Sequence, residues 1–98
     1  MVNNYEIALI FKDNETAAAE GLKNVKEILQ NFNIEITGED VWGSRKLAYP
    51  IEKEKNGYYV FLKVKGDSLN IKKIERDLKL NNNILRFMVI KEDKKKVK

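Results

Sequence analysis

Residues 42–61, WGSRKLAYPIEKEKNGYYVF, predict two strands and the loop that joins them. The stretch opens with an aromatic, basic segment that ends at the only proline of the chain. Proline disfavours a helical conformation in the residue before it, so Tyr49 is expected to be extended. Asn56 and Gly57 are typical of turns, because glycine accepts positive φ without steric cost. Aromatic and β-branched residues dominate from Tyr58 onward, as in a strand. We therefore expect a strand, a charged loop and a second strand.

A strand and an amphipathic helix are predicted on the N-terminal side of this stretch. Residues 5–11 have apolar side chains on both faces, which is typical of a strand in the middle of a sheet. Asp13 and Asn14 are candidate N-caps for the helix that follows. Its apolar stripe recurs every three or four residues. The stripe consists of Ala18, Leu22, Val25, Leu29 and Phe32.

Three further elements complete the chain. The strand that contains the start of the opening stretch runs from about residue 34 to residue 46, and Gly38 or Gly43 is expected to mark a bulge. Asp67 or Ser68 can cap a second helix. The apolar stripe of that helix is Ile71, Ile74 and Leu78. The helix is followed by a predicted turn at Asn81, Asn82 and Asn83, and the last strand covers residues 84–90.

This order of elements predicts the fold. It is β-α-β-β-α-β, and right-handed crossovers make it an α+β, ferredoxin-like two-layer sandwich with an antiparallel four-stranded sheet. Both helices must cover the same face of the sheet to bury their stripes. We expect the core between these layers to include Leu29, Phe32, Val60, Leu62 and Leu78.

The other sheet face is predicted to carry no helix and to be a partner surface. Strand alternation places apolar side chains there, and a contiguous apolar group on an uncovered face is typical of a binding site. Two alternatives stay open, an inverted face in one strand and an ordinary surface. The predicted residues are Ala8, Ile10, Tyr59, Phe61, Met88 and Ile90, with Lys63 and Arg86 among them.

Composition narrows the class of protein. Ninety-eight residues predict one domain, residues 1–91, followed by a basic tail, residues 92–98. The net charge is +4, of which residues 91–98 carry +3. Basic arms can neutralise phosphates, although most such tails are simply solvated. No apolar run is long enough for a membrane span, and because a strand is predicted so near the start we expect no signal peptide.

Catalysis is not expected. The chain has no histidine and no cysteine, which removes the commonest general base, the commonest nucleophile and thiolate metal ligands. Its five glycines are scattered rather than grouped in a phosphate-binding loop. No carboxylate pair or metal-ligand cluster is apparent. We therefore expect no cofactor, no metal and no small-molecule substrate, and the absence of cysteine fits a reducing cytoplasm.

Three stretches resemble one known family. The run W-G-x-R-K-L-A-Y-P-I before a G-Y-Y strand is similar to the central signature of the bacterial small-subunit ribosomal protein six family. The start NNYE at residues 3–6 and the end ILRFMVIK at residues 84–91 also resemble that family, whereas the two helices match in pattern only. The low arginine content departs from many members.

The resemblance implies a structural protein of the cytoplasmic ribosome. It implies pairing with small-subunit protein eighteen and binding to the central domain of small-subunit ribosomal RNA. The candidate RNA-binding residues are Arg45, Lys46, Arg86 and Lys91. The candidate partner-binding residues are Ile10, Tyr59, Phe61, Met88 and Ile90.

A free-standing RNA-binding or regulatory module of the same fold is the alternative. Sheet aromatics of this topology stack unpaired bases in RNA-recognition domains. The spacing here does not match their motif, because Gly57 falls on an aromatic position and Tyr58 on a small one. Trp42 is expected to be a packing or partner anchor rather than a reader of bases.

Overall fold

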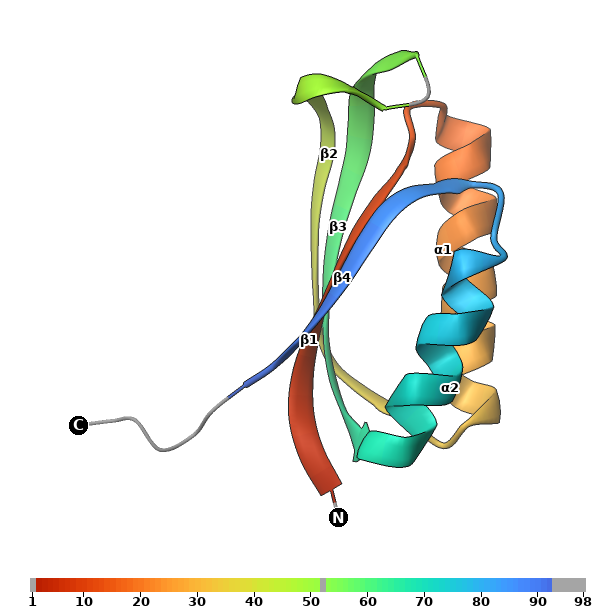
Figure 1. The fold of residues 1–98 in the computed structure, drawn as a ribbon, viewed down its shortest axis with the longest axis vertical. Helices are drawn as coiled ribbons and strands as arrows, with labels where there is room; N and C mark the ends of the chain where they lie inside the picture. The colour runs from red at the N-terminus through yellow and green to blue at the C-terminus, as the bar shows by residue number, and fades with distance from the viewer. Residues whose placement is uncertain (1, 52, 93–98) are drawn as a thin grey trace, which may run out of the picture.

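The structure has the predicted β-α-β-β-α-β order. It is a computed structural model that describes residues 2–51 and 53–92. The strands form one antiparallel sheet in the order β2-β3-β1-β4, and both helices cover the same face of it (Figure 1). The elements are β1 (Val2–Lys12), α1 (Glu15–Asn31), β2 (Glu35–Ile51), β3 (Glu54–Asp67), α2 (Ser68–Lys79) and β4 (Ile84–Lys91).

Local side-chain caps begin both helices. Asn14 is the N-cap of α1, and its Oδ1 accepts hydrogen bonds from the N–H groups of Thr16 and Ala17 at 2.9 and 3.2 Å. Asp67 caps α2 and accepts from the N–H of Leu69 at 2.9 Å. These bonds satisfy backbone donors that have no partner inside the helix. Asn14 and Asp67 are therefore the caps among the predicted candidates.

The core lies between the sheet and the helices. Four of the five predicted core residues are buried, and Phe32 is half-buried against the same cluster. The buried cluster consists of Tyr5, Ile7, Leu9, Phe11, Ala18, Val25, Leu29, Ile34, Val60, Leu62, Val64, Ile71, Ile74 and Leu78. The apolar stripes of both helices and one face of β1 and β3 supply it.

The predicted loop at Pro50 is shorter than expected. β2 continues to Ile51 and β3 begins at Glu54, so the charged loop is largely part of a long hairpin. Pro50 is tolerated because the ladder is irregular between Lys46 and Ile51, and a missing N–H breaks no regular pair there. Lys53, with φ of 70°, takes the left-handed conformation at the turn.

The predicted turn at Asn56 and Gly57 was wrong. Gly57 lies inside β3, paired with Lys12 on one side and Arg45 on the other. A Cβ at Gly57 would lie 2.4 Å from Ile10 Cγ2 and 3.2 Å from Leu47 Cδ2. The glycine therefore allows close side-chain packing across the sheet instead of a turn.

The irregularity predicted at Gly38 or Gly43 is confirmed, and the structure has one at each of the two glycines. The register between β2 and β3 shifts before each of them, and Gly43 has φ of 81°. One extra residue in a strand reverses which face the following side chains occupy. The second shift therefore puts Arg45 on the same face as Trp42, three residues earlier.

The domain boundary predicted at residue 91 coincides with the end of β4, and Glu92 still donates its N–H to the Asn4 carbonyl at 2.8 Å. The rest of the predicted tail, residues 93–98, lies outside the described residues. No helix in the described part of the chain is both long and apolar enough to cross a membrane.

Candidate functional site

Three aromatic rings pack together on the sheet face that has no helix. The Trp42 ring lies 4.7 Å from the Phe61 ring at 50°, and 6.4 Å from the Tyr59 ring at 23°, measured between centroids. The indole Nε1 donates to Asp40 Oδ2 at 3.1 Å, which fixes its orientation. Trp42 remains 47% exposed, whereas Tyr59 and Phe61, which pack against it, are partly buried. The outermost surface of the cluster is therefore the indole.

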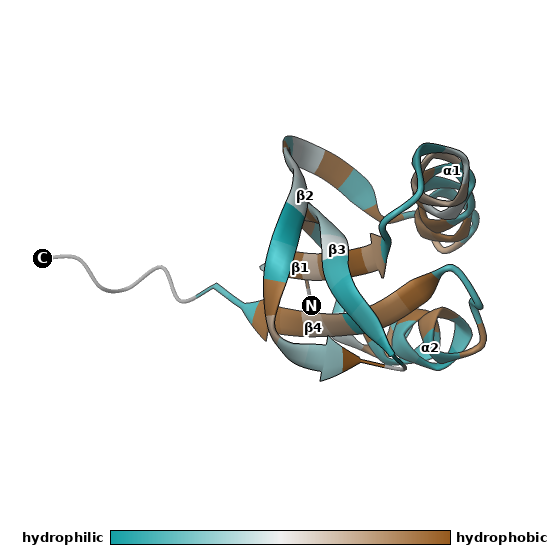
Figure 2. Ribbon diagram, turned by 90° about the horizontal axis from the view of Figure 1, so that it is seen from above, coloured by the Kyte–Doolittle hydropathy of each residue, from teal (hydrophilic) through white to brown (hydrophobic). Residues whose placement is uncertain are grey.

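The cluster continues into an apolar row across the sheet. Phe61 is opposite Ala8, and Ala8 is opposite Met88, so these side chains share one face. Met88 and Ile90 are 56% and 46% exposed. Figure 2 shows the hydrophobic ribbon of β4 and both helices on the other side of the sheet. We call this surface the open-face patch, and it consists of Ala8, Trp42, Tyr59, Phe61, Met88 and Ile90.

Ile10 lies at the margin of the patch. It pairs with Tyr59 and Arg86, which places it on the uncovered face as predicted. Leu47, from the hairpin, packs near it over Gly57 and is buried outside the main core. Ile10 is thus less available to a partner than Met88 or Ile90.

Two arginines flank the open-face patch from opposite edges of the sheet. Arg45 on β2 has its guanidinium carbon 5.9 Å from the Trp42 ring centroid, and its Nη1 donates to the Ser44 carbonyl at 3.0 Å. Arg86 projects from β4, opposite Ile10. Three strand spacings separate β2 from β4, or roughly 14 Å. The patch therefore lies between two cations.

The other two predicted RNA-binding residues lie elsewhere. Lys46 pairs with Asn56 and Lys91 pairs with Tyr5, so alternation points both side chains away from the uncovered face. They also lie toward opposite ends of the sheet. The structure does not gather the four candidates into one cluster.

Trp42 and Leu47 are the residues of this surface that the sequence did not place there. Simple alternation along β2 assigns a face only while the register is regular, and the shift at Gly43 breaks it. The sequence feature that indicates this shift is Gly43, because a glycine inside a strand often marks a bulge. A bulge was predicted, but its location was left open between two glycines.

The surface is suited to contact rather than catalysis. No described group of three or more acidic, histidine or cysteine side chains could hold a metal. Among the described residues no side-chain nitrogen or oxygen is both buried and without a hydrogen bond. The face offers aromatic area, exposed aliphatic side chains and cations, which is the usual composition of an interface.

Comparison with known proteins decides the family. The family model described as "Ribosomal protein S6" matches residues 4–91. The chain belongs to this ribosomal protein S6 family. It is 36% identical over 90 residues to small ribosomal subunit protein bS6 of Leptospira biflexa, covering 92% of this chain and 97% of the relative. It is 38% identical to the bS6 protein of Clostridioides difficile, covering 91% and 98%.

Solved structures agree on the fold. The 30S ribosomal protein S6 from Thermotoga maritima superposes with a TM-score of 0.86 at 24% identity, over 94% of this chain and 89% of that one. The C-terminal domain of an MgtC protein from Mycobacterium tuberculosis has a TM-score of 0.68 at 9% identity, over 99% and 95%. The second likeness shows that the architecture alone does not define a function.

Family membership settles the coarse role of the chain. It is a structural protein of the small ribosomal subunit in the bacterial cytoplasm, and not an enzyme.

Proposed function

We propose that the chain binds the central domain of small-subunit ribosomal RNA together with small-subunit protein eighteen. The protein partner covers the open-face patch, and the RNA contacts the cations Arg45, Lys46, Arg86 and Lys91. The observation that carries this proposal is the aromatic and aliphatic surface on a sheet face that neither helix covers.

The open-face patch supports a protein partner. Met88 and Ile90 are large apolar side chains that remain about half exposed in the isolated chain. Trp42 offers a rigid aromatic surface held by its hydrogen bond to Asp40. Buried aromatic anchors of this kind commonly dominate binding energy at protein interfaces.

The flanking arginines support an RNA contact beside that partner. Guanidinium groups present a planar, permanently charged fork that matches phosphate. Arg86 is on a paired strand, so its backbone is already ordered before binding. Lys46 and Lys91 extend the positive charge toward the two ends of the sheet.

Stacking of unpaired bases directly on the sheet aromatics, as in a free-standing RNA-binding module, has less support. Trp42 packs over Phe61 and Tyr59, so a base cannot reach both of those rings without displacing the indole. The indole is the most exposed ring of the cluster, so the alternative depends mainly on stacking at Trp42.

Reconstitution with purified components tests the proposal. We expect a central-domain RNA fragment to bind weakly to this chain alone, and much more tightly when protein eighteen is added. The measurement is RNA affinity by filter binding, with and without that protein, at fixed salt concentration. Tight binding of a short single-stranded RNA by this chain alone would favour the free-standing module.

A further inference from the structure

The uncovered face of the sheet changes in charge from one end to the other. At the end far from the β2-β3 hairpin, Glu6 lies opposite Lys63 and Glu35 lies opposite Lys65, so charges of opposite sign face each other across the strands. The open-face patch follows in the middle of this face. The end beside the hairpin carries cations alone among the charged residues that the structure describes there.

Four cations meet at the hairpin end. Lys12 of β1 and Arg45 of β2 both pair with Gly57 of β3, so their backbones are two strand spacings apart, or roughly 10 Å. Alternation along β3 puts Lys55 on the same face as Gly57, two residues away. Arg86 of β4 lies one row nearer the patch. We call this group the basic end, and it consists of Lys12, Arg45, Lys55 and Arg86.

No carboxylate in the described part of the chain offsets the basic end. From the row of Tyr59 to the hairpin, none of the described residues on the uncovered face is acidic. The first carboxylate toward the patch is Asp40, which lies in the row of Phe61 and accepts a hydrogen bond from the indole of Trp42. The basic end therefore presents uncompensated positive charge.

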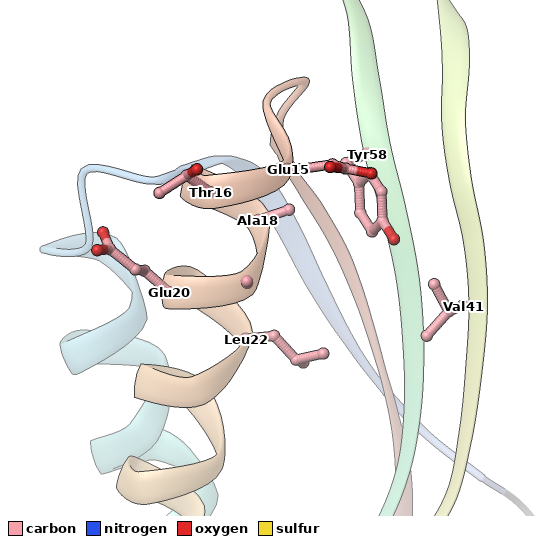
Figure 3. Close-up of a pocket in the computed structure, with 8 residues that line it drawn as sticks. Glu15, Thr16, Ala18, Glu20, Leu22, Val41 and Tyr58 are labelled. Atoms are coloured by element: carbon pink, nitrogen blue, oxygen red, sulfur yellow. The ribbon is translucent and has the colours of Figure 1, made fainter.

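The helix side of the same end is not positive in this way. It contains a groove of about 630 Å³ between α1 and β2, and Figure 3 shows Val41 and Tyr58 facing α1 across it, with Glu15 beside Tyr58. Asp13 bonds to a side chain on this side, and Lys46 also points here. Because carboxylates accompany the lysine, a polyanion that approaches the hairpin is drawn to the uncovered face.

We propose that the basic end is a binding site for the phosphate backbone of ribosomal RNA, in which Lys12 and Lys55 act together with Arg45 and Arg86. The proposal rests on the function proposed above and adds two lysines to its RNA contacts. Lysine binds phosphate as a point charge, so these contacts fix the position of the RNA without reading its sequence. Because the basic end borders the open-face patch, a protein partner and the RNA backbone can lie side by side.

A short uridine oligonucleotide tests the site on the unmodified chain, without a partner protein. Its phosphates supply the chemistry that the site should recognise. At low salt concentration we expect amide shifts in the NMR spectrum at Lys12, Lys55 and Gly57, and none at Lys63 or Lys65. This contrast is informative because all four lysines lie on one face and only the last two are opposite carboxylates.

Charge-matched double variants test the site in the complex with protein eighteen. Lys12→Gln with Lys55→Gln should weaken the binding of central-domain RNA about tenfold. The same variant should reduce the slope of log affinity against log salt concentration by about one for each lysine. Lys63→Gln with Lys65→Gln removes the same charge from the same face and should change this slope little. Lys12→Arg with Lys55→Arg keeps both charges and should keep the slope.

Two results would overturn the proposal. One is an equal loss of salt dependence in the two glutamine double variants, because only net charge would then matter. The other is a set of oligonucleotide shifts confined to Trp42 or to Lys63 and Lys65, and this result is decisive even if a variant does not fold.

The two proposals fail separately. If protein eighteen does not tighten RNA binding, the proposed function fails, whereas the oligonucleotide shifts still decide whether the basic end binds phosphates. If protein eighteen does tighten RNA binding but the two glutamine double variants behave alike, the basic end fails and the proposed function stands.

Discussion

At the scale of single residues, Gly21 shows how closely α1 approaches the sheet. A Cβ at this position would lie 2.7 Å from two ring carbons of Phe11 and 3.2 Å from Asn83 Cβ. In an exposed helix, replacing glycine by alanine gains up to about 1 kcal/mol. Here the buried ring of Phe11 has no room to move, so the steric cost should exceed that gain.

We therefore expect Gly21→Ala to destabilise the fold by about 1–3 kcal/mol, the usual cost of overpacking a core. Denaturant titration measures the change in the free energy of unfolding. An increase in stability would mean that the helix can shift away from Phe11, contrary to the packing described.

The core between the helices and the sheet predicts how much stability is lost when a buried leucine is truncated. Leu29 from α1 and Leu62 from β3 are fully buried. Leu29→Ala and Leu62→Ala should each cost about 2–5 kcal/mol. Leu80, which is 77% exposed, provides the control, and Leu80→Ala should change stability by less than about 0.5 kcal/mol. Losses below about 1 kcal/mol at both buried sites would contradict the assignment of the core.

Asp67, the cap of α2, predicts that the stability of the fold depends on pH. The hydrogen bond from the Leu69 N–H is the main cause that holds the pKa of Asp67 below its ordinary value. Because the folded pKa is lower than the unfolded one, the carboxylate stabilises the fold above the unfolded pKa. That contribution is lost as the pH falls through the folded pKa.

Asp67→Asn keeps an oxygen that can accept from Leu69 but does not titrate. We expect the wild type to lose more stability than this variant between pH 5 and strongly acidic solution, judged by thermal unfolding at each pH. Parallel pH profiles would show that Asp67 does not couple protonation to folding.

At the scale of elements, β4 and the tail make different predictions for RNA binding. Arg86 is fixed on β4, whereas the lysines of residues 94–98 follow the last strand. Removing residues 94–98 should weaken RNA assembly modestly and lower its salt dependence. Arg86→Ala should weaken RNA binding more for each charge removed, because an arginine on an ordered strand loses less entropy on binding than a lysine beyond the last strand.

The comparison requires RNA affinity with protein eighteen present, at several salt concentrations. Abolition of binding by the truncation, with no effect of Arg86→Ala, would place the RNA site in the tail.

The elements themselves were largely predictable from the sequence. Helix stripes and strand alternation depend on neighbouring residues, and they identified all six elements and the uncovered face. The hairpin was not predictable in the same way. Asn56 and Gly57 have the composition of a turn, but the need for space beside Ile10 and Leu47 arises only from the assembled sheet.

The candidate site was predicted only in part, because side-chain alternation assigns a face only where a strand is regular. Tyr59, Phe61, Met88 and Ile90 lie on regular strands, so alternation placed them on the correct face. Trp42 follows an irregular register and could not be placed. The groove beside Val41 depends on the distance between α1 and β2, which no local pattern encodes.

At the scale of the whole molecule, charge is divided between the two sides of the chain. Residues 13–40, which include α1 and the first part of β2, have seven acids against two bases. Residues 63–91, which include α2 and β4, have eight bases against three acids. In the sheet, β2 and β4 are the opposite edges, so the acidic first part of β2 lies away from the basic β4, whereas Arg45 and Lys46 add two cations later in β2. Such an uneven charge distribution favours some orientations of the chain toward RNA over others.

The central claim is that the open-face patch binds protein eighteen, and its affinity for that protein is the most direct test. We expect Met88→Glu combined with Ile90→Glu to weaken the complex at least about tenfold, because two charges would be buried against an apolar partner. Leu80→Glu adds a charge to the helix side and should leave the affinity unchanged. Titration calorimetry on variants with unchanged thermal stability gives the answer. An unchanged affinity in the double variant would contradict the account.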